Sequence, residues 1–220
     1  MIENHLKYHT IITYNQRILD SCPNARKYIY GTTWIDKEIY NNVDISRKEF
    51  AISHLSGSKL WQNATGHRFR QTIHYNQEQL KTYPITFYRS CRQQPELPDF
   101  GNNPLIHDSK VVLFETYQFA IVIENSKQTN YFTEKLMDCL LMKTIPIYYG
   151  CPNISDFFDT TGWIIINMLE SENAFYELHS KLYLLCQDKY YYHKYLNIIE
   201  KNHITSQKYT DLYINLNNAI

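Results

Sequence analysis

The polar residues best suited to chemistry form a short cluster between two apolar runs. Asn125 follows the first run directly, and Tyr131, Thr133, Glu134 and Lys135 come a few residues later. A helical pattern begins near these later residues, so we expect them in its first turn. Backbone N–H groups are unpaired at the start of a helix and attract anions. The cluster therefore predicts a site for a phosphate group.

Three elements must hold this cluster in place. Residues 119–123 and 145–149 are apolar runs of strand length, which is typical of strands buried on both faces. Between them, apolar residues recur at helical spacing over 132–140, whereas Glu134 and Asp138 point to other sides. Two parallel strands joined by a helix form a right-handed crossover, and its ligand site lies beyond the carboxyl ends of the strands. These elements place the polar cluster at that site.

Strands and helices alternate along the rest of the chain. The expected strands are 9–14, 25–31, 50–55, 85–88 and 163–167, and the expected helices are 67–82, 110–116, 170–187, 190–202 and 209–218. Residues 91–108 are rich in proline and are expected to form a long loop. This alternation predicts an α/β fold with a Rossmann-like parallel sheet and helices on both faces. We expect residues 48–220 to form that domain, because 1–47 hold too few strands for a core of their own.

The spacing of the cluster also resembles a known donor-binding motif. The runs ENS, NYFTEKL and IPIYYG resemble the motif of the glycosyltransferase family 10 fucosyltransferases. There, a strand ends in Phe-Glu-Asn, a helix starts with Tyr-x-Thr-Glu-Lys, and a second strand ends in Gly. Asn125, Tyr131, Glu134 and Lys135 keep the family's spacing, and Ile123 stands where the family has Phe. The alternative is an unrelated buried crossover with a charged helix start, but burial alone does not require such unevenly spaced polar residues.

The resemblance implies a fold, a reaction and roles for four residues. It implies a GT-B glycosyltransferase with two facing Rossmann-like domains, of which the N-terminal, acceptor-side domain is here shortened to a remnant at 1–47. The family transfers fucose from GDP-fucose, with inversion, in glycoconjugate synthesis. By this resemblance Lys135 binds the diphosphate, Glu134 takes ribose hydroxyls, and Tyr131 and Asn125 line the donor pocket. Charge-assisted hydrogen bonds suit these roles, although Glu134 can instead simply stabilise the helix dipole.

A second cation is expected near the start of the helix at 67–82. Family members carry an Arg at this position. Arg68 is the first candidate for it, and Arg70 is the alternative. These arginines could also have no role in binding and simply lie at a solvent-exposed helix start. Two cations on the diphosphate would stabilise the charge that develops on the leaving GDP. The sequence contains no Asp-x-Asp pair to hold a divalent metal. We therefore expect no metal and no other cofactor.

The catalytic base is the residue that the sequence leaves open. Inverting transfer needs a general base to deprotonate the acceptor hydroxyl. In the family this base is a Glu of the acceptor domain; here Asp20, Asp36 and Glu38 are the carboxylates of that region, and none lies in a matching motif. Glu124, at the end of the strand 119–123, is the remaining candidate. It either contacts the sugar or only locks the following loop.

Three interpretations of the function therefore stay open. The first is a fucosyltransferase, which takes GDP-fucose and a glycan acceptor. The second is a GDP-sugar-binding module that is weak or inactive alone, or that a partner chain or oligomer completes on the acceptor side. The third is a transferase for another GDP-sugar, because the motif identifies the nucleotide and diphosphate better than the sugar.

Composition limits the partners and the compartment. The 220 residues include 22 basic and 22 acidic side chains, so there is no basic field to indicate nucleic-acid binding. Five cysteines without metal-ligand spacing favour reduced thiols in the cytoplasm. The N-terminal residues MIENHLKYHT lack the apolar stretch of a signal peptide, and no apolar run is long enough to cross a membrane. We expect a soluble, cytoplasmic protein.

Overall fold

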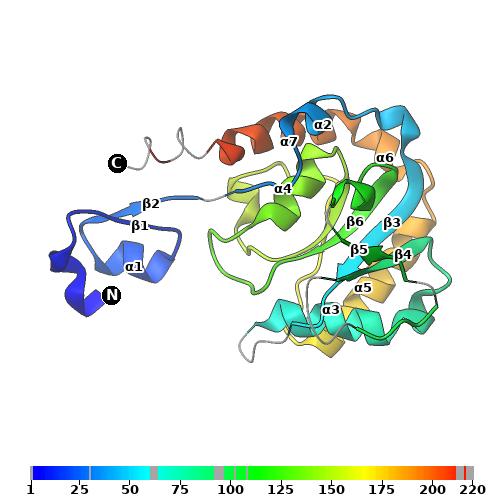
Figure 1. Ribbon diagram of the computed structural model, residues 1–220, viewed down its shortest axis with the longest axis horizontal. Coiled ribbons are helices and arrows are strands. Elements are labelled where there is room, and N and C mark those ends of the chain that lie inside the picture. Colours follow the sequence, from blue (N-terminus) through cyan, green and yellow to red (C-terminus); the bar gives the residue numbers. More distant parts are fainter. Residues whose placement is uncertain are drawn as a thin grey trace.

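The computed structural model describes residues 2–29, 31–59, 64–91, 97–101, 103–107, 109–211 and 216. One six-stranded parallel sheet carries helices on both faces, and a small two-stranded parallel sheet stands apart from it (Figure 1). The strands are β1 (Ile11–Thr13), β2 (Ala25–Lys27), β3 (Glu49–Ser56), β4 (Ile85–Ser90), β5 (Leu105–Ile106), β6 (Tyr117–Ile123), β7 (Ile145–Tyr149) and β8 (Ile164–Ile165). The α/β class expected from the sequence is confirmed.

The helices vary widely in length. The α-helices are α1 (Gln16–Ser21), α2 (Lys37–Asn41), α3 (Thr65–Tyr75), α4 (Glu134–Leu141), α5 (Ser171–Cys186), α6 (Tyr191–Lys194) and α7 (Leu196–Thr210). The 3-10 helices are η1 (Ile2–Lys7), η2 (Ile45–Arg47), η3 (Gln77–Leu80), η4 (Val111–Leu113) and η5 (Ile154–Asp156). Among the described residues, no helix combines the length and the apolar character needed to cross a membrane.

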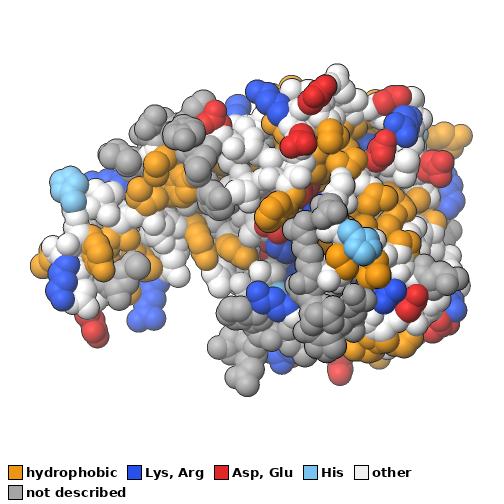
Figure 2. Space-filling view, viewed as in Figure 1, with side chains coloured by type: hydrophobic (Ala, Val, Ile, Leu, Met, Phe, Trp, Pro, Cys, Tyr) orange, Lys and Arg blue, Asp and Glu red, His pale blue; other side chains and the backbone are white. Residues whose placement is uncertain are grey.

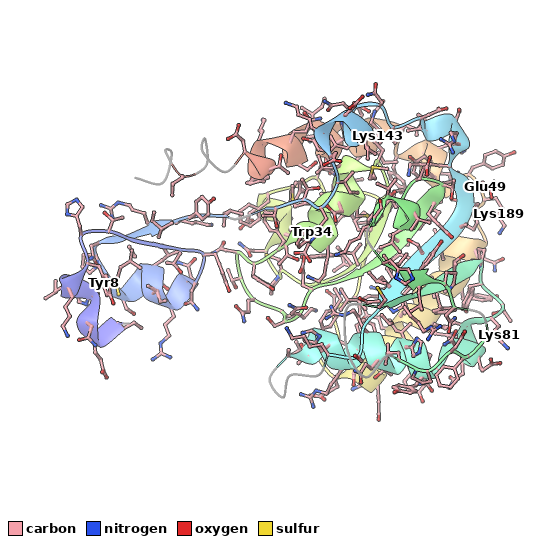
Figure 3. The ribbon with its side chains drawn as sticks, viewed as in Figure 1. Tyr8, Trp34, Glu49, Lys81, Lys143 and Lys189 are labelled. Atoms are coloured by element: carbon pink, nitrogen blue, oxygen red, sulfur yellow. The ribbon has the colours of Figure 1, made fainter. Side chains whose placement is uncertain are left out.

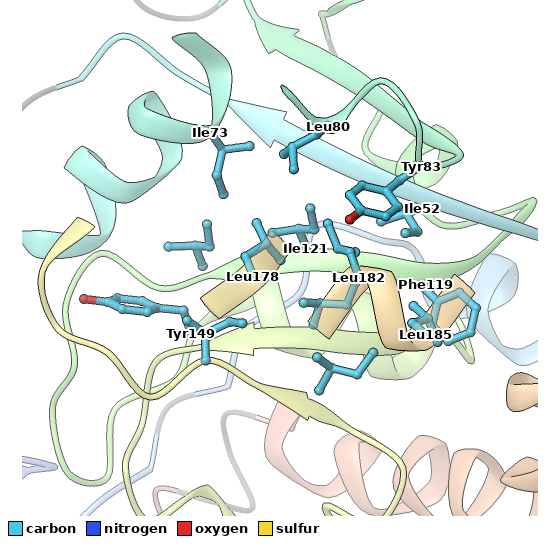
Figure 4. Close-up of a cluster of buried hydrophobic side chains, with 14 of the residues drawn as sticks. Ile52, Ile73, Leu80, Tyr83, Phe119, Ile121, Tyr149, Leu178, Leu182 and Leu185 are labelled. Carbon is cyan, nitrogen blue, oxygen red and sulfur yellow. The ribbon is translucent and has the colours of Figure 1, made fainter. Parts of the chain in front are cut away.

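The pleat of the central strands creates two buried faces. Side chains alternate between the faces along a strand. In β6, Phe119 and Ile121 point to the face that α3 and α5 cover, whereas Ala120 and Val122 point to the face that α4 covers. Figure 4 shows the first face, with Leu178 among the side chains packed against the sheet. Every residue of β6 is buried, which explains why 119–123 is an unbroken apolar run.

The order of the strands creates a crevice at the centre of the large sheet. The strands run β5-β4-β3-β6-β7-β8 and all pair in parallel. The chain therefore moves from β3 outward to β5, returns to the centre at β6, and then moves outward on the other side to β8. Ligands of such sheets bind beyond the carboxyl ends of the strands where this direction reverses. Here that position lies between β3 and β6, and α3 and α4 each begin near it.

Several elements differ from the sequence-based expectation. The expected helix at 67–82 is α3 followed by η3, and the expected helix at 110–116 is only the turn η4. A two-residue strand, β5, interrupts the expected loop at 91–108 and adds an edge to the sheet. The helix expected at 190–202 is divided into α6 and α7, and α7 continues to Thr210. Most of the helix expected at 209–218 lies outside the described residues.

The N-terminal part of the chain forms a protruding unit, here defined as residues 2–28. It contains η1, β1, α1 and β2, and Figures 1 and 2 show it beside the main body with apolar side chains on its surface. Leu6 is 87% exposed and Tyr8 is 54% exposed. The unit meets the main body where Tyr14 packs against Tyr131, with ring centroids 5.3 Å apart, and where Asn130 donates from Nδ2 to the Tyr14 carbonyl at 3.3 Å.

The following segment packs against the main body. Ile35 and Tyr40 are only 3% and 4% exposed and belong to the buried cluster on the α4 face. The sequence did not predict α2, which contains Tyr40, because its five residues are mostly polar. A division of the chain at 47/48 remains a prediction, and the burial of these two side chains favours a division closer to residue 30.

Candidate functional site

A cavity of about 300 Å³ lies in the crevice between β3 and β6. Residues from the ends of both strands line it, together with the first turns of α3 and α4. Its charged and polar lining side chains include His67, Arg70, Asn125, Glu134, Lys135, Asp138, Lys59 and Lys110. Its apolar walls come from the α4 face of the sheet and from η4. A cationic cavity of this size suits a phosphorylated ligand with a flat or apolar part.

Gly66 allows the start of α3 to approach β6 closely. The Gly66 amide donates to the Asn125 carbonyl at 3.0 Å. A Cβ atom at this position would lie 1.7 Å from the Glu124 carbonyl oxygen, which is far inside van der Waals contact. Only glycine fits this approach. The contact brings the side chains of His67 and Arg70 to the carboxyl end of β6.

Arg70 is the buried cation of the cavity. Its guanidinium donates to the Ile123 carbonyl at 2.5 Å and to Asn125 Oδ1 at 2.9 Å, and it lies 2.8 Å from His67 Nδ1. The residue is 9% exposed. Burial lowers the pKa of Arg70 to about 10, so it remains charged at neutral pH. These three contacts fix a positive charge at the mouth of the strand.

His67 presents a neutral ring to the cavity. Burial, together with the charges of Arg70 and Lys59, lowers the pKa of His67 to about 4. Because Arg70 donates to Nδ1, the proton of the neutral ring belongs on Nε2. His67 is therefore a hydrogen-bond donor at pH 7 and not a second cation.

The first turn of α4 supplies the second fixed cation. Thr133 is the N-cap, and its hydroxyl accepts from the Lys135 amide at 3.4 Å and from Lys135 Nζ at 3.0 Å. Lys135 Nζ also lies 2.9 Å from Glu134 Oε1. Burial raises the pKa of Glu134, but the charge of Lys135 and its hydrogen bond outweigh burial and leave this pKa below its ordinary value. Both side chains line the cavity.

Glu124 stabilises the loop that precedes α4. It is fully buried, and its two carboxylate oxygens accept from the Thr133 amide at 2.9 Å and from the Thr133 hydroxyl at 2.6 Å. Burial raises the pKa of Glu124, while Lys135 and the Thr133 hydrogen bonds oppose that rise. Glu124 is not among the residues that line the cavity. Of the two roles that the sequence left open, this geometry supports locking the loop.

The structure separates the candidate residues that the sequence grouped. Arg70, Asn125, Glu134 and Lys135 line one cavity. Arg68, the first candidate for the second cation, instead lines a separate hollow between α3 and α5, because successive side chains of a helix point in different directions. Tyr131 packs against Tyr14 and is not among the residues that line the cavity.

No carboxylate from the N-terminal segment reaches the cavity. Asp20 accepts a hydrogen bond from Gln16 on the exposed helix α1, and Asp36 and Glu38 lie at the start of α2. None of the three lines the cavity. Among the described residues, no group of three His, Cys, Asp or Glu side chains has the arrangement needed to hold a metal ion.

Sequence reasoning missed Asp138 and Trp34, which also line the cavity. Asp138 was expected to point away from the buried side of its helix, but it is 1% exposed and lines the cavity. Trp34 comes from the segment that crosses α4, and Figure 3 labels it there. The available signal for Asp138 was its position one turn after Glu134, which places the two carboxylates on one side of α4. Nothing in the sequence pattern linked Trp34 to this site.

Comparison with known proteins shows the family. The family profile described as "Glycosyltransferase family 10 (fucosyltransferase) C-term" matches residues 56–216. The chain belongs to this family. The match to the family profile confirms the resemblance seen in the donor-binding motif. It assigns the chain to a family of glycosyltransferases.

Individual relatives match parts of this glycosyltransferase family 10 chain. "Alpha-(1,3)-fucosyltransferase B" of Drosophila melanogaster is 35% identical over 115 residues, which are 49% of this chain and 26% of that protein. "GDP-fucose protein O-fucosyltransferase 3" of Xenopus laevis is 32% identical over 94 residues, which are 42% of this chain and 20% of that protein. The matches thus span about a quarter or less of these relatives.

A solved structure shows a similar fold. The crystal structure of TarM superposes with a TM-score of 0.54 and 15% sequence identity, covering 99% of this chain and 45% of that chain. This similarity concerns the fold alone and agrees with a GT-B type architecture.

Proposed function

We propose that this chain binds the donor for a fucosyltransferase that moves fucose from GDP-fucose, with inversion, to a hydroxyl group of a glycan. The observation that carries the proposal is that Arg70 and Lys135, from two different helices, line one cavity at the crevice between β3 and β6. Family membership and the names of the relatives support GDP-fucose as the donor.

In this proposal the diphosphate lies between the two cations. Lys135 binds one phosphate through its ammonium group, and Arg70 binds on the side of β6. His67 donates a neutral hydrogen bond from Nε2. As the bond between the sugar and the diphosphate breaks, negative charge grows on the leaving GDP, and these fixed donors stabilise it.

The remaining site residues position the nucleoside and the sugar. Glu134 is ionised and accepts hydrogen bonds from vicinal ribose hydroxyls, while Asn125, held by Arg70, borders the pocket. Tyr131 closes the side that faces the protruding unit. We propose that the two cations replace a divalent metal, so that donor binding needs no metal and no other cofactor.

The acceptor side and the general base are proposed to lie outside this cavity. Inversion requires a base that faces the sugar carbon from the side opposite the leaving group. Because Asp20, Asp36 and Glu38 do not line the cavity, we propose that a residue beyond the matched donor region, or a partner chain, supplies the base. The second candidate function, a GDP-sugar-binding module that needs such a partner, rests on this observation.

We also propose a reducing, cytoplasmic setting. All five cysteines lie in described parts of the chain as free thiols. Burial raises the pKa of Cys139 and Cys151, which keeps both thiols protonated. Reduced buried thiols of this kind are typical of proteins in reducing compartments.

Calorimetry with matched lysine variants tests the donor site. Lys143 follows the end of α4 and pairs with Glu200 at 2.8 Å. Lys135→Ala should weaken GDP binding by about ten- to a hundredfold, because one charge-assisted contact contributes about 1.5–3 kcal/mol. Lys143→Ala should change it by less than about threefold. Equal, small effects at both positions would contradict the proposed phosphate site.

Calorimetry with two donors tests which sugar the site accepts. Tighter binding of GDP-fucose than of GDP-mannose supports fucose as the sugar, and tighter binding of GDP-mannose supports a transferase of another GDP-sugar. Binding unchanged in EDTA supports metal independence, whereas loss of GDP affinity in EDTA would contradict it.

Release of GDP only after a glycan acceptor is added identifies an active enzyme. Binding without such release, over hours, supports the binding module.

A further inference from the structure

Asp138 has a buried oxygen without a hydrogen-bond partner. One carboxylate oxygen, Oδ1, accepts from the Thr33 hydroxyl at 2.6 Å and from the Trp34 amide at 2.9 Å. The other, Oδ2, has no hydrogen-bond partner in the part of the chain that the structure describes. Leaving a buried acceptor unpaired is unfavourable, and for a charged group especially so. This oxygen therefore needs a hydrogen-bond donor that the described residues do not supply.

The surroundings of Asp138 indicate the shape of that donor. Asp138 lines the cavity with Trp34, whose side chain is 62% exposed and lies at the rim. Leu113, Phe114 and Val122 supply apolar walls. This end of the cavity thus combines an aromatic ring, apolar surface and one hydrogen-bond acceptor. A flat heteroaromatic ring with N–H groups on its edge matches all three features.

The place of Asp138 on α4 relates it to the nucleotide. Asp138 follows Glu134 by one helical turn, about 6 Å along the axis at about 1.5 Å per residue. In the proposed function the diphosphate lies at the start of this helix and the ribose at Glu134. This inference rests on that function, because the base of the same nucleotide then extends in the direction of Asp138 and Trp34.

Among nucleobases, guanine best satisfies a lone carboxylate. Its Watson–Crick edge offers two adjacent donors, N1–H and the exocyclic N2–H₂. Adenine would instead direct its N1 lone pair at the carboxylate, and uracil would place carbonyl oxygens on both sides of its single N–H. A site with a buried polar group discriminates strongly against ligands that leave this group unpaired.

We propose that Asp138 is the residue that selects guanine, by accepting hydrogen bonds from the base edge at Oδ2, and that Trp34 stacks on the base. Oδ1 is already committed to Thr33 and Trp34. The same carboxylate therefore fixes the Trp34 backbone and recognises the base. Lys110, whose Nζ lies 5.5 Å from the Trp34 ring centroid, borders the same space and adds positive charge near the carboxylate.

The variant Asp138→Asn tests base selection without changing the shape of the side chain. The Trp34 amide needs an acceptor, so the Asn oxygen must face it and the Asn amino group must occupy the position of Oδ2. This amino group is a donor and no longer matches guanine. It does match xanthine, which carries a carbonyl group where guanine carries the 2-amino group.

Affinities for GDP, IDP and XDP are measured by calorimetry on the full chain and on the variant. The wild-type protein should bind GDP with about tenfold or more higher affinity than IDP, which lacks the 2-amino group, and than XDP. Asp138→Asn should lower GDP affinity and raise XDP affinity, so that the GDP/XDP ratio falls by about a hundredfold. An unchanged ratio overturns the inference, and misfolding cannot imitate a change of preference between two nucleotides.

Trp34→Ala tests the stacking part. It should lower the affinity for GDP, IDP and XDP by a common factor of about tenfold, because stacking does not depend on the edge of the base. Tyr8→Ala, at an exposed aromatic residue of the protruding unit, is the matched control and should change none of them. Unchanged affinities in Trp34→Ala would overturn the stacking role. If the wild-type protein binds none of GDP, IDP and XDP, the proposed function is overturned as well.

Discussion

At the scale of residues, Arg68 and Arg70 differ in direction and not in chemistry. Arg70 is buried in the cavity and bonded to Asn125, whereas Arg68 faces the hollow between α3 and α5. Arg70→Ala should therefore lower GDP affinity by about tenfold or more, and Arg68→Ala by less than about threefold. Calorimetry on both variants measures this, and Arg70→Lys, which keeps the charge, separates loss of charge from loss of folding. A larger loss in Arg68→Ala would contradict the site.

The sequence could predict the residue types of the site but not all of its members. Asn125, Glu134 and Lys135 were found because they lie next to strongly periodic elements. The choice between Arg68 and Arg70 depended on the rotation of α3, which the contact of Gly66 with the Glu124 carbonyl sets. Such a contact joins residues distant in the sequence, so local periodicity does not reveal it.

At the scale of elements, α4 depends on a single hydroxyl group. The Thr133 hydroxyl caps the helix and donates to the buried Glu124 carboxylate. Thr133→Val removes both contacts and should lower the free energy of unfolding by about 2–4 kcal/mol, whereas Thr133→Ser should stay close to the unchanged protein. Urea denaturation measures both. The double variant with Glu124→Gln should be less destabilised than the sum of the single variants; additive losses would mean that the two groups act separately.

The opposite end of the sheet is held by a buried lysine. Lys48 donates from Nζ to the carbonyls of Phe114 and Tyr117 at 2.7 and 3.0 Å and to the Thr144 hydroxyl at 2.9 Å. These contacts join the starts of β3, β6 and β7. Burial lowers the pKa of Lys48 from 10.5 to about 7, although the charge of Glu115 opposes this shift.

The lowered pKa of Lys48 makes stability depend on pH. Between about pH 7 and 10.5, the unfolded chain keeps a proton that the folded chain has released. The free energy of unfolding should therefore rise with pH there, by up to about 1.4 kcal/mol per pH unit relative to Lys48→Met. Below pH 7 both states bind the proton, and this contribution stays constant. Parallel stability curves for the two proteins from pH 7 to 9 would refute the expectation.

Elements with long regular patterns were predictable, and short ones were not. β6, α4 and β7 followed from apolar periodicity, since both faces of the sheet are covered. β5 has two residues in a proline-rich stretch, and it is a strand only because β4 offers an unpaired edge. α2 has five mostly polar residues, and its one buried side chain, Tyr40, gives no periodic signal.

At the scale of the whole molecule, the limit of the donor domain decides which deletions are tolerated. The protruding unit exposes Leu6 and Tyr8, and it meets the main body at Tyr14, Gln16 and Lys27. The next segment is different, because Ile35 is buried on the α4 face and Thr33 donates to Asp138. We propose that this segment belongs to the donor domain and that the remnant of an acceptor-side domain ends near residue 30.

Two deletions distinguish this limit from a division at 47/48. Removing residues 1–28 should cost only about 1 kcal/mol, because it exposes little that is now buried. Removing residues 1–47 also takes away Ile35 and Tyr40, and each buried side chain of this size contributes about 1.5–3 kcal/mol. The longer deletion should therefore lose about 3–6 kcal/mol and release the Asp138 carboxylate from Thr33. Urea denaturation of both truncated proteins measures the difference, and equal stability would place the limit at 47/48 instead.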